Sequence, residues 1–351
     1  MEKMMLAAAK TKAAPGIELI TVPVPKITDE EVLVKVKASG LCGSDVHTYL
    51  WEKTMHYKEK YLPLILGHEF SGEVVEVGRS VTTVKIGDRV LAKPTHPCGK
   101  CWFCRNHRPA DCVDRATCGT TKAGAFAEYC AIHEDQVVHM PDNMTWEQGA
   151  IIEPLGVGTN CAIRADIEYG DFVVVSGPGP IGLVATLAAR SLGAGRIAVF
   201  GTSRDAKRLA LAKELGADYT FMGDQCDIVQ EIRALTNGQG ADVALECVGV
   251  SSLLQTDLSL IRKRGKVCCA GIYSTPATFD LDDTVRNSKT IIGAYAGYSF
   301  ERSVQWITGN NELAQKAVKI ISHRSSLREI EDALQRAMHQ ENVKEVFTKF
   351  D

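Results

Sequence analysis

A glycine-rich turn between an apolar strand and an apolar helix constrains the fold of this chain more than any other sequence feature. Gly177-Pro-Gly179-Pro-Ile-Gly182 matches the pattern G-x-G-x-x-G. It follows the apolar segment 171–176 and opens a helical pattern over 181–192, which distinguishes it from an ordinary glycine-proline loop. In such a turn the first glycine permits the bend, the second lets the backbone approach a pyrophosphate, and the third lets helix and strand pack closely. The predicted dinucleotide-binding residues here are Gly177, Gly179, Pro180, Ile181 and Gly182.

The chain after residue 162 alternates short apolar strands with helices. Strands are predicted at 171–176, 196–200, 242–246, 266–270 and 290–293. Such alternation is typical of an α/β fold with a parallel, doubly wound sheet, the Rossmann fold. A helix N-terminus after the first of these strands would place free N–H groups against the cofactor phosphates.

The first 150 residues have a different pattern. Strands rich in β-branched residues are predicted at 32–38, 72–77 and 88–92, separated by glycine and proline. The last 60 residues are predicted to be helical and polar-faced, except for a final strand at 345–349. Since 351 residues exceed the usual size of one domain, two domains are expected.

The residues after the second Rossmann strand bear on the choice between NAD and NADP. About 20 positions after the last glycine, NAD-binding proteins carry an acid that holds the ribose 2′-hydroxyl. Here Ser203 takes that position and Arg204 follows, and a guanidinium is well shaped to hold a 2′-phosphate. The alternative is that Arg204 is a solvated loop residue and Asp205 a helix cap. We favour NADP(H) over NAD(H).

Four cysteines lie within one short loop. Cys98, Cys101, Cys104 and Cys112 have the spacing x2, x2 and x7, and Gly99 lies among them. Four thiolates at short spacing predict a closed tetrahedral zinc site, which is structural because no coordination position stays open. Disulfides are the alternative, but no signal peptide opens the chain, so a reducing, cytoplasmic setting is expected.

A second group of possible zinc ligands is dispersed along the chain. Cys42, His68, Glu69 and Glu153 are all of residue types that bind zinc. The residues alone do not join them, because a histidine between glycine and glutamate is often a hydrogen-bonded core residue. Joining them depends on a resemblance to known proteins.

The chain resembles the zinc-containing medium-chain alcohol dehydrogenases along nearly its whole length. The matching stretches are Cys42-Gly-Ser44-Asp-Val-His47, Gly67-His68-Glu69-Phe-Ser-Gly72, the four-cysteine loop, Glu153-Pro-Leu155 and the glycine motif. Within that family it is most similar to the sorbitol, xylitol and threonine dehydrogenase branch. The resemblance implies a partly open, β-rich barrel-like catalytic domain formed by 1–155 and 295–351, with a Rossmann domain at 156–294.

The resemblance also implies roles for single residues. Cys42, His68 and Glu69 would bind a catalytic zinc, and Glu153 would either ligate it or hold its water. The zinc would act as a Lewis acid that lowers the pKa of the alcohol, so that hydride can pass to the nicotinamide. Ser44 would contact the reacting oxygen and His47 would continue the proton relay. The alternatives are a turn hydroxyl for Ser44 and a structural hydrogen bond for His47.

The substrate is predicted less directly than the chemistry. Sorbitol-type enzymes usually carry an arginine on the strand after the Rossmann domain. Here the corresponding stretch, 293–298, contains no arginine, and the next one is Arg302. Tyr295 or Tyr298 could shape the pocket instead. Tyr49 and Trp51 are closer to threonine dehydrogenases, although Trp51 could equally be core packing. We expect a polyol–ketose pair. The alternatives are L-threonine 3-dehydrogenase, a butanediol or secondary alcohol dehydrogenase, and a non-catalytic zinc- and nucleotide-binding protein.

Composition excludes some partners. A formal net charge of -3 gives no reason to expect nucleic acid or an anionic membrane surface. The uncharged run 172–189 contains the glycine-proline turn, so it predicts strand, turn and helix rather than a membrane span. By analogy with the resembled branch, a homo-oligomer is expected, with a tetramer favoured.

Overall fold

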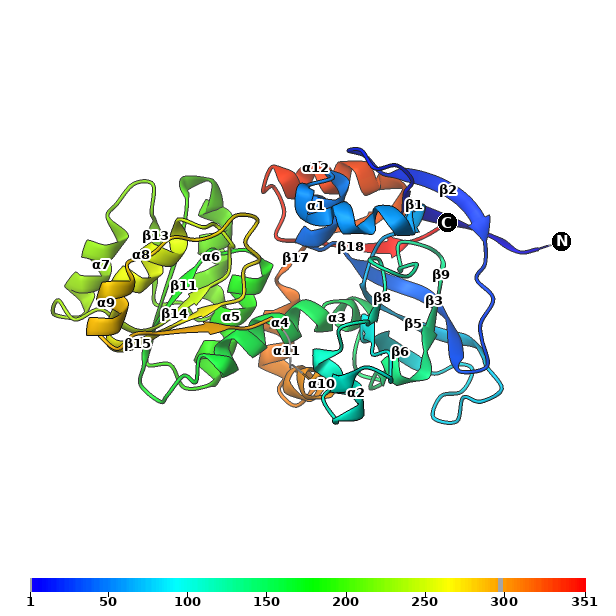
Figure 1. Cartoon of the computed structure of the whole chain (residues 1–351), viewed down its shortest axis with the longest axis horizontal. Helices are drawn as coiled ribbons and strands as arrows, with labels where there is room; N and C mark the ends of the chain where they lie inside the picture. Colours follow the sequence, from blue (N-terminus) through cyan, green and yellow to red (C-terminus); the bar gives the residue numbers. More distant parts are fainter. Residues whose placement is uncertain (1, 296–298) are drawn as a thin grey trace. The chain divides into compact units, whose positions relative to one another are not determined.

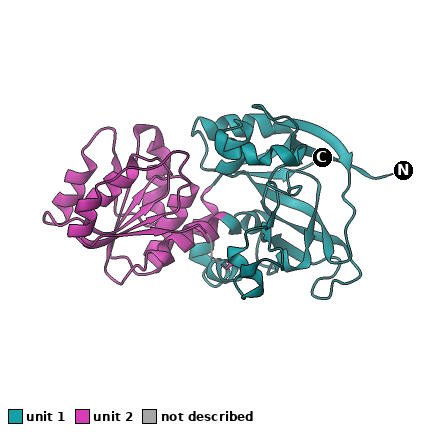
Figure 2. Cartoon of the chain, in the orientation of Figure 1, with its two compact units in different colours: residues 1–153, 300–314, 321–351 teal, residues 154–299, 315–320 magenta. Residues whose placement is uncertain are grey.

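The computed structural model of the chain describes residues 2–295 and 299–351, and its course is shown in Figure 1. The chain divides into two compact units (Figure 2). Unit 1 comprises Met1–Glu153, Phe300–Ala314 and Ile321–Asp351, and unit 2 comprises Pro154–Ser299 and Gln315–Ile320. Within the described residues no helix is long and apolar enough to cross a membrane.

Unit 2 contains a six-stranded sheet in which every neighbouring pair is parallel. Its strands are β11 (Phe172–Ser176), β12 (Arg196–Gly201), β13 (Tyr219–Met222), β14 (Ala241–Glu246), β15 (Ile261–Cys269) and β16 (Thr290–Gly293). The order across the sheet is β13-β12-β11-β14-β15-β16. Because the strand order reverses beside β11, this is the doubly wound arrangement with its switch point next to the glycine motif, and the predicted Rossmann fold is confirmed.

Helices connect these parallel strands. They are α5 (Pro180–Ser191), α6 (Ala206–Leu215), α7 (Ile228–Leu235), α8 (Leu253–Leu260) and α9 (Leu281–Arg286), and α4 (Ile152–Arg164) precedes the first strand, β11. β11 is buried at every position, as the apolar run Phe-Val-Val-Val-Ser predicts for a central parallel strand. Pro180 begins α5, where its missing N–H and fixed φ suit the first helical position.

Unit 1 is built on mostly antiparallel sheets. Its strands are β1 (Met4–Lys10), β2 (Glu18–Pro23), β3 (Glu31–Gly40), β4 (Leu64–Ile65), β5 (Glu69–Val77), β6 (Arg89–Ala92), β7 (Thr95–His96), β8 (Ala116–Thr117), β9 (Tyr129–His133), β10 (Val137–His139), β17 (Ile321–Ser326) and β18 (Lys344–Lys349). The largest sheet has the order β10-β6-β5-β3-β18-β17, and β9 also pairs with β3, at residues 31–35. Since no path of strands closes on itself within residues 2–295 and 299–351, the β-rich unit is open, in agreement with the expected fold class.

The helices of unit 1 lie around these sheets. They are α1 (Gly43–Tyr49), α2 (Trp102–Arg105), α3 (Trp146–Ala150), α10 (Phe300–Thr308), α11 (Asn311–Val318, which runs on into unit 2) and α12 (Ile330–Met338). The main core of the unit includes Phe70, Phe126 and Phe347, from three separate segments of the chain. Phe126 and Phe347 meet edge to face, with ring centroids 5.2 Å apart.

The prediction of a helical C-terminal region with a single final strand is wrong for residues 321–326. They form β17, which pairs in parallel with β18. The segment Ile-Ser-His-Arg-Ser-Ser is polar and only partly buried, so its own composition does not indicate a strand. Pairing with β18 therefore determines its conformation.

Candidate active site

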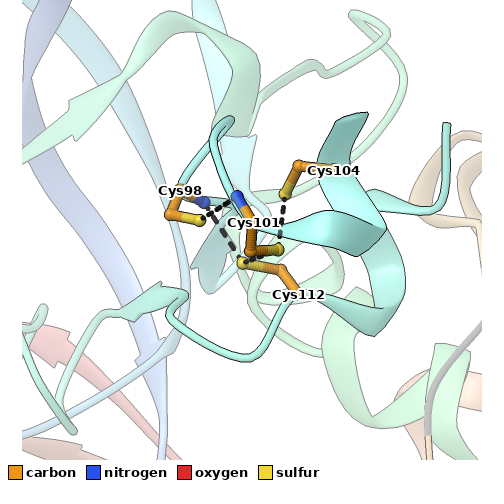
Figure 3. Close-up of side chains that lie close together, drawn as sticks. All are labelled: Cys98, Cys101, Cys104 and Cys112. Carbon is orange, nitrogen blue, oxygen red and sulfur yellow. Dashed lines mark hydrogen bonds between the residues drawn. The ribbon is translucent and has the colours of Figure 1, made fainter. Parts of the chain in front are cut away.

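The four cysteines of the loop after β7 converge (Figure 3). The sulfur atoms of Cys98, Cys101, Cys104 and Cys112 all lie within 4.8 Å of one another. Sγ of Cys101 is 3.5 Å from Sγ of Cys104 and 3.9 Å from Sγ of Cys112. Tetrahedral zinc with Zn–S bonds of 2.3 Å requires S···S separations of about 3.8 Å. All four thiols are free, so the disulfide alternative is not what the structure contains.

The protonation of these thiols depends on their neighbours. A backbone N–H of Cys104 stabilises the Cys101 thiolate and lowers its pKa to about 6. Desolvation and the neighbouring thiols raise the pKa of Cys104 to about 12. Four thiolates at this distance repel one another unless a cation lies between them, so the donor set fits a zinc ion.

A second group of possible ligands also converges, formed by Cys42, His68 and Glu69. In the sequence Cys42 is 26 residues from His68 and 27 from Glu69. Their ligand atoms lie within 4.8 Å of one another. Cys42 is the N-cap of α1, and Glu69 is the first residue of β5, where it pairs with Gly40 of β3. A Cβ at position 40 would lie 2.2 Å from Oε2 of Glu69, so this glycine makes room for the carboxylate.

Negative charge concentrates around His68. Burial, the largest effect, disfavours its charged ring, but Cys42, Asp45 and Glu153 outweigh burial and raise the pKa of His68 well above its ordinary value. Glu153, in the first turn of α4, is outside the group of three described above but close enough to act on this ring. Thiolate, imidazole and carboxylate at one partly buried position form a donor set that fits a divalent cation such as zinc.

Asp45 supports the histidine. It is buried, and its Oδ2 accepts a hydrogen bond of 3.0 Å from the backbone N–H of Cys42. Its Oδ1 is 3.9 Å from Nδ1 of His68 and accepts no hydrogen bond from any described residue. Asp45 therefore acts on the imidazole through its charge rather than through a hydrogen bond.

Glu69 is engaged by a buried lysine. Nζ of Lys344, on β18, donates to Oε1 of Glu69 at 2.6 Å and to the carbonyl of Leu41 at 2.8 Å. Nζ also forms an ion pair with Oε2, which accepts no hydrogen bond from the described part of the chain. Burial opposes the charge of Lys344, yet Glu69 and Cys42 keep its pKa raised. The charge of Glu69 is thus compensated before any metal binds.

Ser44 and His47 lie on α1, beyond Cys42. The carbonyl of Ser44 accepts a hydrogen bond of 2.7 Å from Oγ1 of Thr48, which in turn accepts one of 2.8 Å from Nζ of the buried Lys58. His47 is exposed, and its Nδ1 is 2.9 Å from Glu52. Ser44 is partly buried, whereas His47 is exposed to solvent.

The glycine motif has the geometry that phosphate binding requires. Gly177 has a φ of 91°, a left-handed conformation that favours glycine. A Cβ at Gly182 would lie 1.9 Å from the carbonyl oxygen of Gly177, so only glycine lets the helix start there. A Cβ at Gly179 would meet no atom within 4 Å, so at this N-cap of α5 the backbone faces open space.

Ser203 and Arg204 lie in a short 3-10 helix, Ser203–Asp205, after β12. Both donors of Ser203 are bound by Asp224: Oδ1 accepts from its N–H at 2.8 Å and Oδ2 from its hydroxyl at 2.6 Å. Asp205 is the N-cap of α6 but does not cap it with its side chain. Its Oδ2 accepts instead from the N–H of Thr202 at 3.0 Å.

A third group of metal-type residues consists of His96, His133 and Asp135. The two imidazole rings are stacked, with centroids 4.0 Å apart and planes 27° apart. Nδ1 of His133 accepts a hydrogen bond from the N–H of Asp135 at 3.1 Å. Because imidazole lone pairs lie in the ring plane, stacked rings do not direct them at one ion, so we do not interpret this group as a metal site.

The residues considered for substrate binding are dispersed. The hydroxyl of Tyr49 forms hydrogen bonds with Glu331 and Gln335, both on α12. The ring of Trp51 stacks on that of His56, with ring centroids 5.4 Å apart. These contacts account for both side chains as packing within unit 1. Tyr295 is largely exposed, and Tyr298 lies outside the described residues.

Three residues at these sites escaped the sequence analysis. Asp45 has a local signal, since an acid three residues after an N-cap commonly binds the N-cap N–H. Lys344 is 275 positions from Glu69 and has no such signal. Asp224 comes from the loop after β13, a strand that the sequence analysis did not predict.

Comparison with known proteins places these sites in a family. Residues 28–142 match the alcohol dehydrogenase GroES-like domain, and residues 180–309 match the zinc-binding dehydrogenase family. The chain is 34% identical to a sorbitol dehydrogenase of Halalkalibacterium halodurans, with 99% of this chain and 100% of that protein covered. It is 34% identical to a D-arabitol-phosphate dehydrogenase of Enterococcus avium, covering 95% of each, and 32% identical to an L-threonine 3-dehydrogenase of Rhizobium etli, covering 95% and 96%.

A solved structure has the same fold. A putative zinc-binding dehydrogenase from Sinorhizobium meliloti 1021, bound to NADP, superimposes with a TM-score of 0.88 at 28% identity. The match covers 99% of this chain and 100% of that one.

Proposed function

Because this chain belongs to the family of zinc-binding, NAD(P)-dependent alcohol dehydrogenases, we propose that it interconverts a polyol and its ketose with NADP(H). The observation that carries the proposal is the convergence of Cys42 and His68 with carboxylates in a chain that holds a separate four-thiol site. One set suits an ion with an open position and the other a closed one. We assign zinc chemistry to residues 1–155 and 295–351, and dinucleotide binding to 156–294.

Each zinc has its own residues in the proposal. Cys98, Cys101, Cys104 and Cys112 hold a structural ion. Cys42, His68 and a carboxylate from Glu69 or Glu153 hold the catalytic ion. When bound, zinc supplies a Lewis acid and the nicotinamide accepts or gives the hydride. The buried pair of Glu69 with Lys344 favours Glu153 as the carboxylate that completes the catalytic set.

The remaining residues position groups and move a proton. Asp45 adds negative charge beside His68, which favours a cation at that ring. Ser44 contacts the reacting oxygen, and its place in the first turn of α1, two residues after Cys42, supports this role. His47 passes the proton on to water, which its exposure and its contact with Glu52 support.

The choice of cofactor rests on Ser203 and Arg204. A hydroxyl and a guanidinium after β12 suit a 2′-phosphate better than an acid at that position would. NADP is the cofactor bound in the similar structure from Sinorhizobium meliloti.

Two rival activities and one rival class remain. L-threonine 3-dehydrogenase and butanediol dehydrogenase are activities of similar proteins. A polyol is favoured because the relatives named for sorbitol and arabitol phosphate are 34% identical to this chain, against 32% for the threonine dehydrogenase. A non-catalytic zinc- and nucleotide-binding protein would have no need of an open ligand set.

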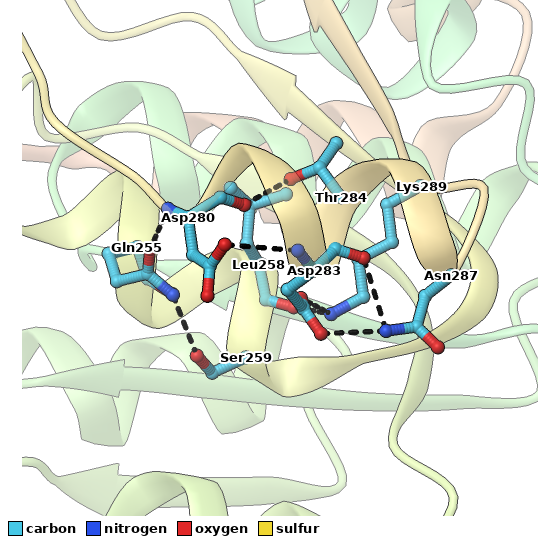
Figure 4. Close-up of polar contacts among 8 residues, drawn as sticks. All are labelled: Gln255, Leu258, Ser259, Asp280, Asp283, Thr284, Asn287 and Lys289. Atoms are coloured by element: carbon cyan, nitrogen blue, oxygen red, sulfur yellow. Dashed lines mark hydrogen bonds and ion pairs between the residues drawn. The ribbon is translucent and has the colours of Figure 1, made fainter.

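We also propose a homo-oligomer, with a tetramer favoured. β16 is an edge strand, and the side chains of Leu281, Val285 and Ile291 near it are exposed. This edge is anchored: Nζ of Lys289 donates to the carbonyl of Leu258 and to Asp283, each at 2.7 Å (Figure 4). An exposed apolar sheet edge that is held in place by hydrogen bonds suits pairing with a second copy of the chain. The twelve free thiols suit a cytoplasmic location.

The test is a panel assay of the purified chain. Sorbitol, xylitol, erythritol, butanediol and L-threonine are offered with NADP and with NAD, and zinc is counted by mass spectrometry. The proposal expects polyol turnover with NADP and two zinc ions per chain. Turnover of threonine with NAD would contradict the substrate and cofactor together, and one zinc without turnover would favour the non-catalytic protein. Ser203→Asp combined with Arg204→Leu should move the preference to NAD.

A further inference from the structure

Asp224 lies where a nucleotide's ribose is expected, yet it belongs to no predicted motif. It follows β13 and is exposed. Its two carboxylate oxygens accept from the N–H of Ser203 at 2.8 Å and from its hydroxyl at 2.6 Å. Both donors of Ser203 are thus held by an acid from the next strand of the sheet.

Those donors are the ones that a ribose 2′-phosphate would use. A carboxylate and a phosphate are both anionic acceptors that take two hydrogen bonds side by side. The hydrogen bonds from Ser203, with the nearby charge of Arg204, lower the pKa of Asp224. The acid is therefore ionised at neutral pH and repels a phosphate placed beside it.

The ribose 2′-hydroxyl of NAD presents the opposite case. It is a donor, and an ionised carboxylate at this edge accepts its hydrogen bond as the acid of NAD-binding proteins does. NAD can therefore bind with Asp224 in place. NADP binds only after the two hydrogen bonds from Ser203 to Asp224 break.

We propose that Asp224 is a specificity-determining residue, an internal acceptor in the place of the 2′-phosphate that lowers the preference for NADP which Ser203 and Arg204 create. The proposal rests on the proposed function, because it takes the loop after β12 to hold the adenosine ribose. It predicts that the chain accepts both cofactors, with Asp224 setting their ratio.

The experiment measures binding without turnover, so it does not depend on the substrate. Titration calorimetry of the full chain with 2′,5′-ADP and with 5′-AMP is compared for the wild type, Asp224→Ala and Asp224→Asn. Removing the acid should tighten the binding of 2′,5′-ADP about tenfold, because the phosphate then meets free donors on Ser203 and no negative charge beside them. Affinity for 5′-AMP should stay constant or fall. Asp224→Asn should give an intermediate gain.

Glu231→Gln is the matched control, because it removes one exposed negative charge from α7, which follows the Asp224 loop. An equal gain from this variant, or unchanged 2′,5′-ADP affinity in Asp224→Ala, would overturn the role of Asp224 while leaving the proposed function intact. Failure of the wild type to bind either nucleotide would overturn the nucleotide site itself, and this proposal with it. Circular dichroism of each variant verifies that it is folded.

Discussion

Nζ of Lys344 donates to Oε1 of Glu69 at 2.6 Å, and both side chains are buried, with 2% and 1% of their surfaces exposed. The two residues are 275 positions apart in the sequence, on β18 and β5. β18 pairs with β3 at Gly40, which also faces Glu69. The final strand therefore carries the cation that neutralises the acid beside the candidate catalytic ligands.

Lys344→Met should destabilise the metal-free protein by about 3 kcal/mol, because removing one partner leaves a buried, uncompensated carboxylate. The loss of unfolding free energy should be smaller in the double variant Lys344→Met/Glu69→Gln, because this variant no longer carries the uncompensated carboxylate of Glu69. Urea unfolding of the metal-free chain measures both. Equal stability of the wild type and Lys344→Met would show that Glu69 is not held by this lysine.

Much of the fold could be predicted from local pattern. The strand, glycine turn and helix from β11 to α5 are continuous in the sequence, so their apolar runs and glycines are sufficient to indicate them. β17 could not be predicted because its residues are polar and its conformation depends on β18. β13 was missed for a related reason, since every residue of this short edge strand is only partly buried.

The candidate site divides in the same way. The four-cysteine loop carries its whole ligand set in one short segment, and the structure brings all four sulfur atoms together. The convergence of Cys42, His68 and Glu69 required the resemblance to a family, because the antiparallel pairing of β3 and β5 brings them together. The partners of these residues, Lys344 above all, depend on tertiary structure that no local pattern encodes.

Cys98→Ser should remove one zinc ion per chain and lower the thermal midpoint, because a structural zinc contributes its binding free energy to folding. The catalytic zinc should stay bound. Mass spectrometry of metal content and a thermal melt measure both effects. Cys226→Ser is the control, since this thiol lies outside the four-cysteine loop. Equal metal content in Cys98→Ser and Cys226→Ser would contradict a zinc site in the loop.

Asp257 should make stability fall with rising pH. It is fully buried on α8, and burial raises its pKa from 3.8 to about 8 despite a hydrogen bond from Ser176. Between these two values the folded chain keeps a proton that the unfolded chain has lost. The free energy of unfolding therefore decreases by about 1.4 kcal/mol per pH unit across that window from this group.

Asp257→Asn removes this titration while keeping the shape of the protonated acid. Urea unfolding at pH 5 and at pH 8 measures the free energy of unfolding of both proteins. This free energy should decrease less between pH 5 and pH 8 for the variant than for the wild type, so the variant gains stability relative to the wild type at pH 8. Parallel pH dependences for the two proteins would mean that Asp257 is ionised in the folded chain at both values.

Two glycines of the turn after β11 should separate folding from cofactor binding. Gly182→Ala forces a methyl group against the carbonyl of Gly177, so it should destabilise the protein by about 2 kcal/mol. Gly179→Ala meets no atom within 4 Å and has an ordinary φ of -70°, so its cost should stay below about 1 kcal/mol. Its methyl group would nevertheless occupy the space that a pyrophosphate approaches, so the dissociation constant for NADP should rise at least about tenfold. Thermal melts and calorimetric titration distinguish the two effects, and unchanged NADP affinity in Gly179→Ala would place the pyrophosphate elsewhere.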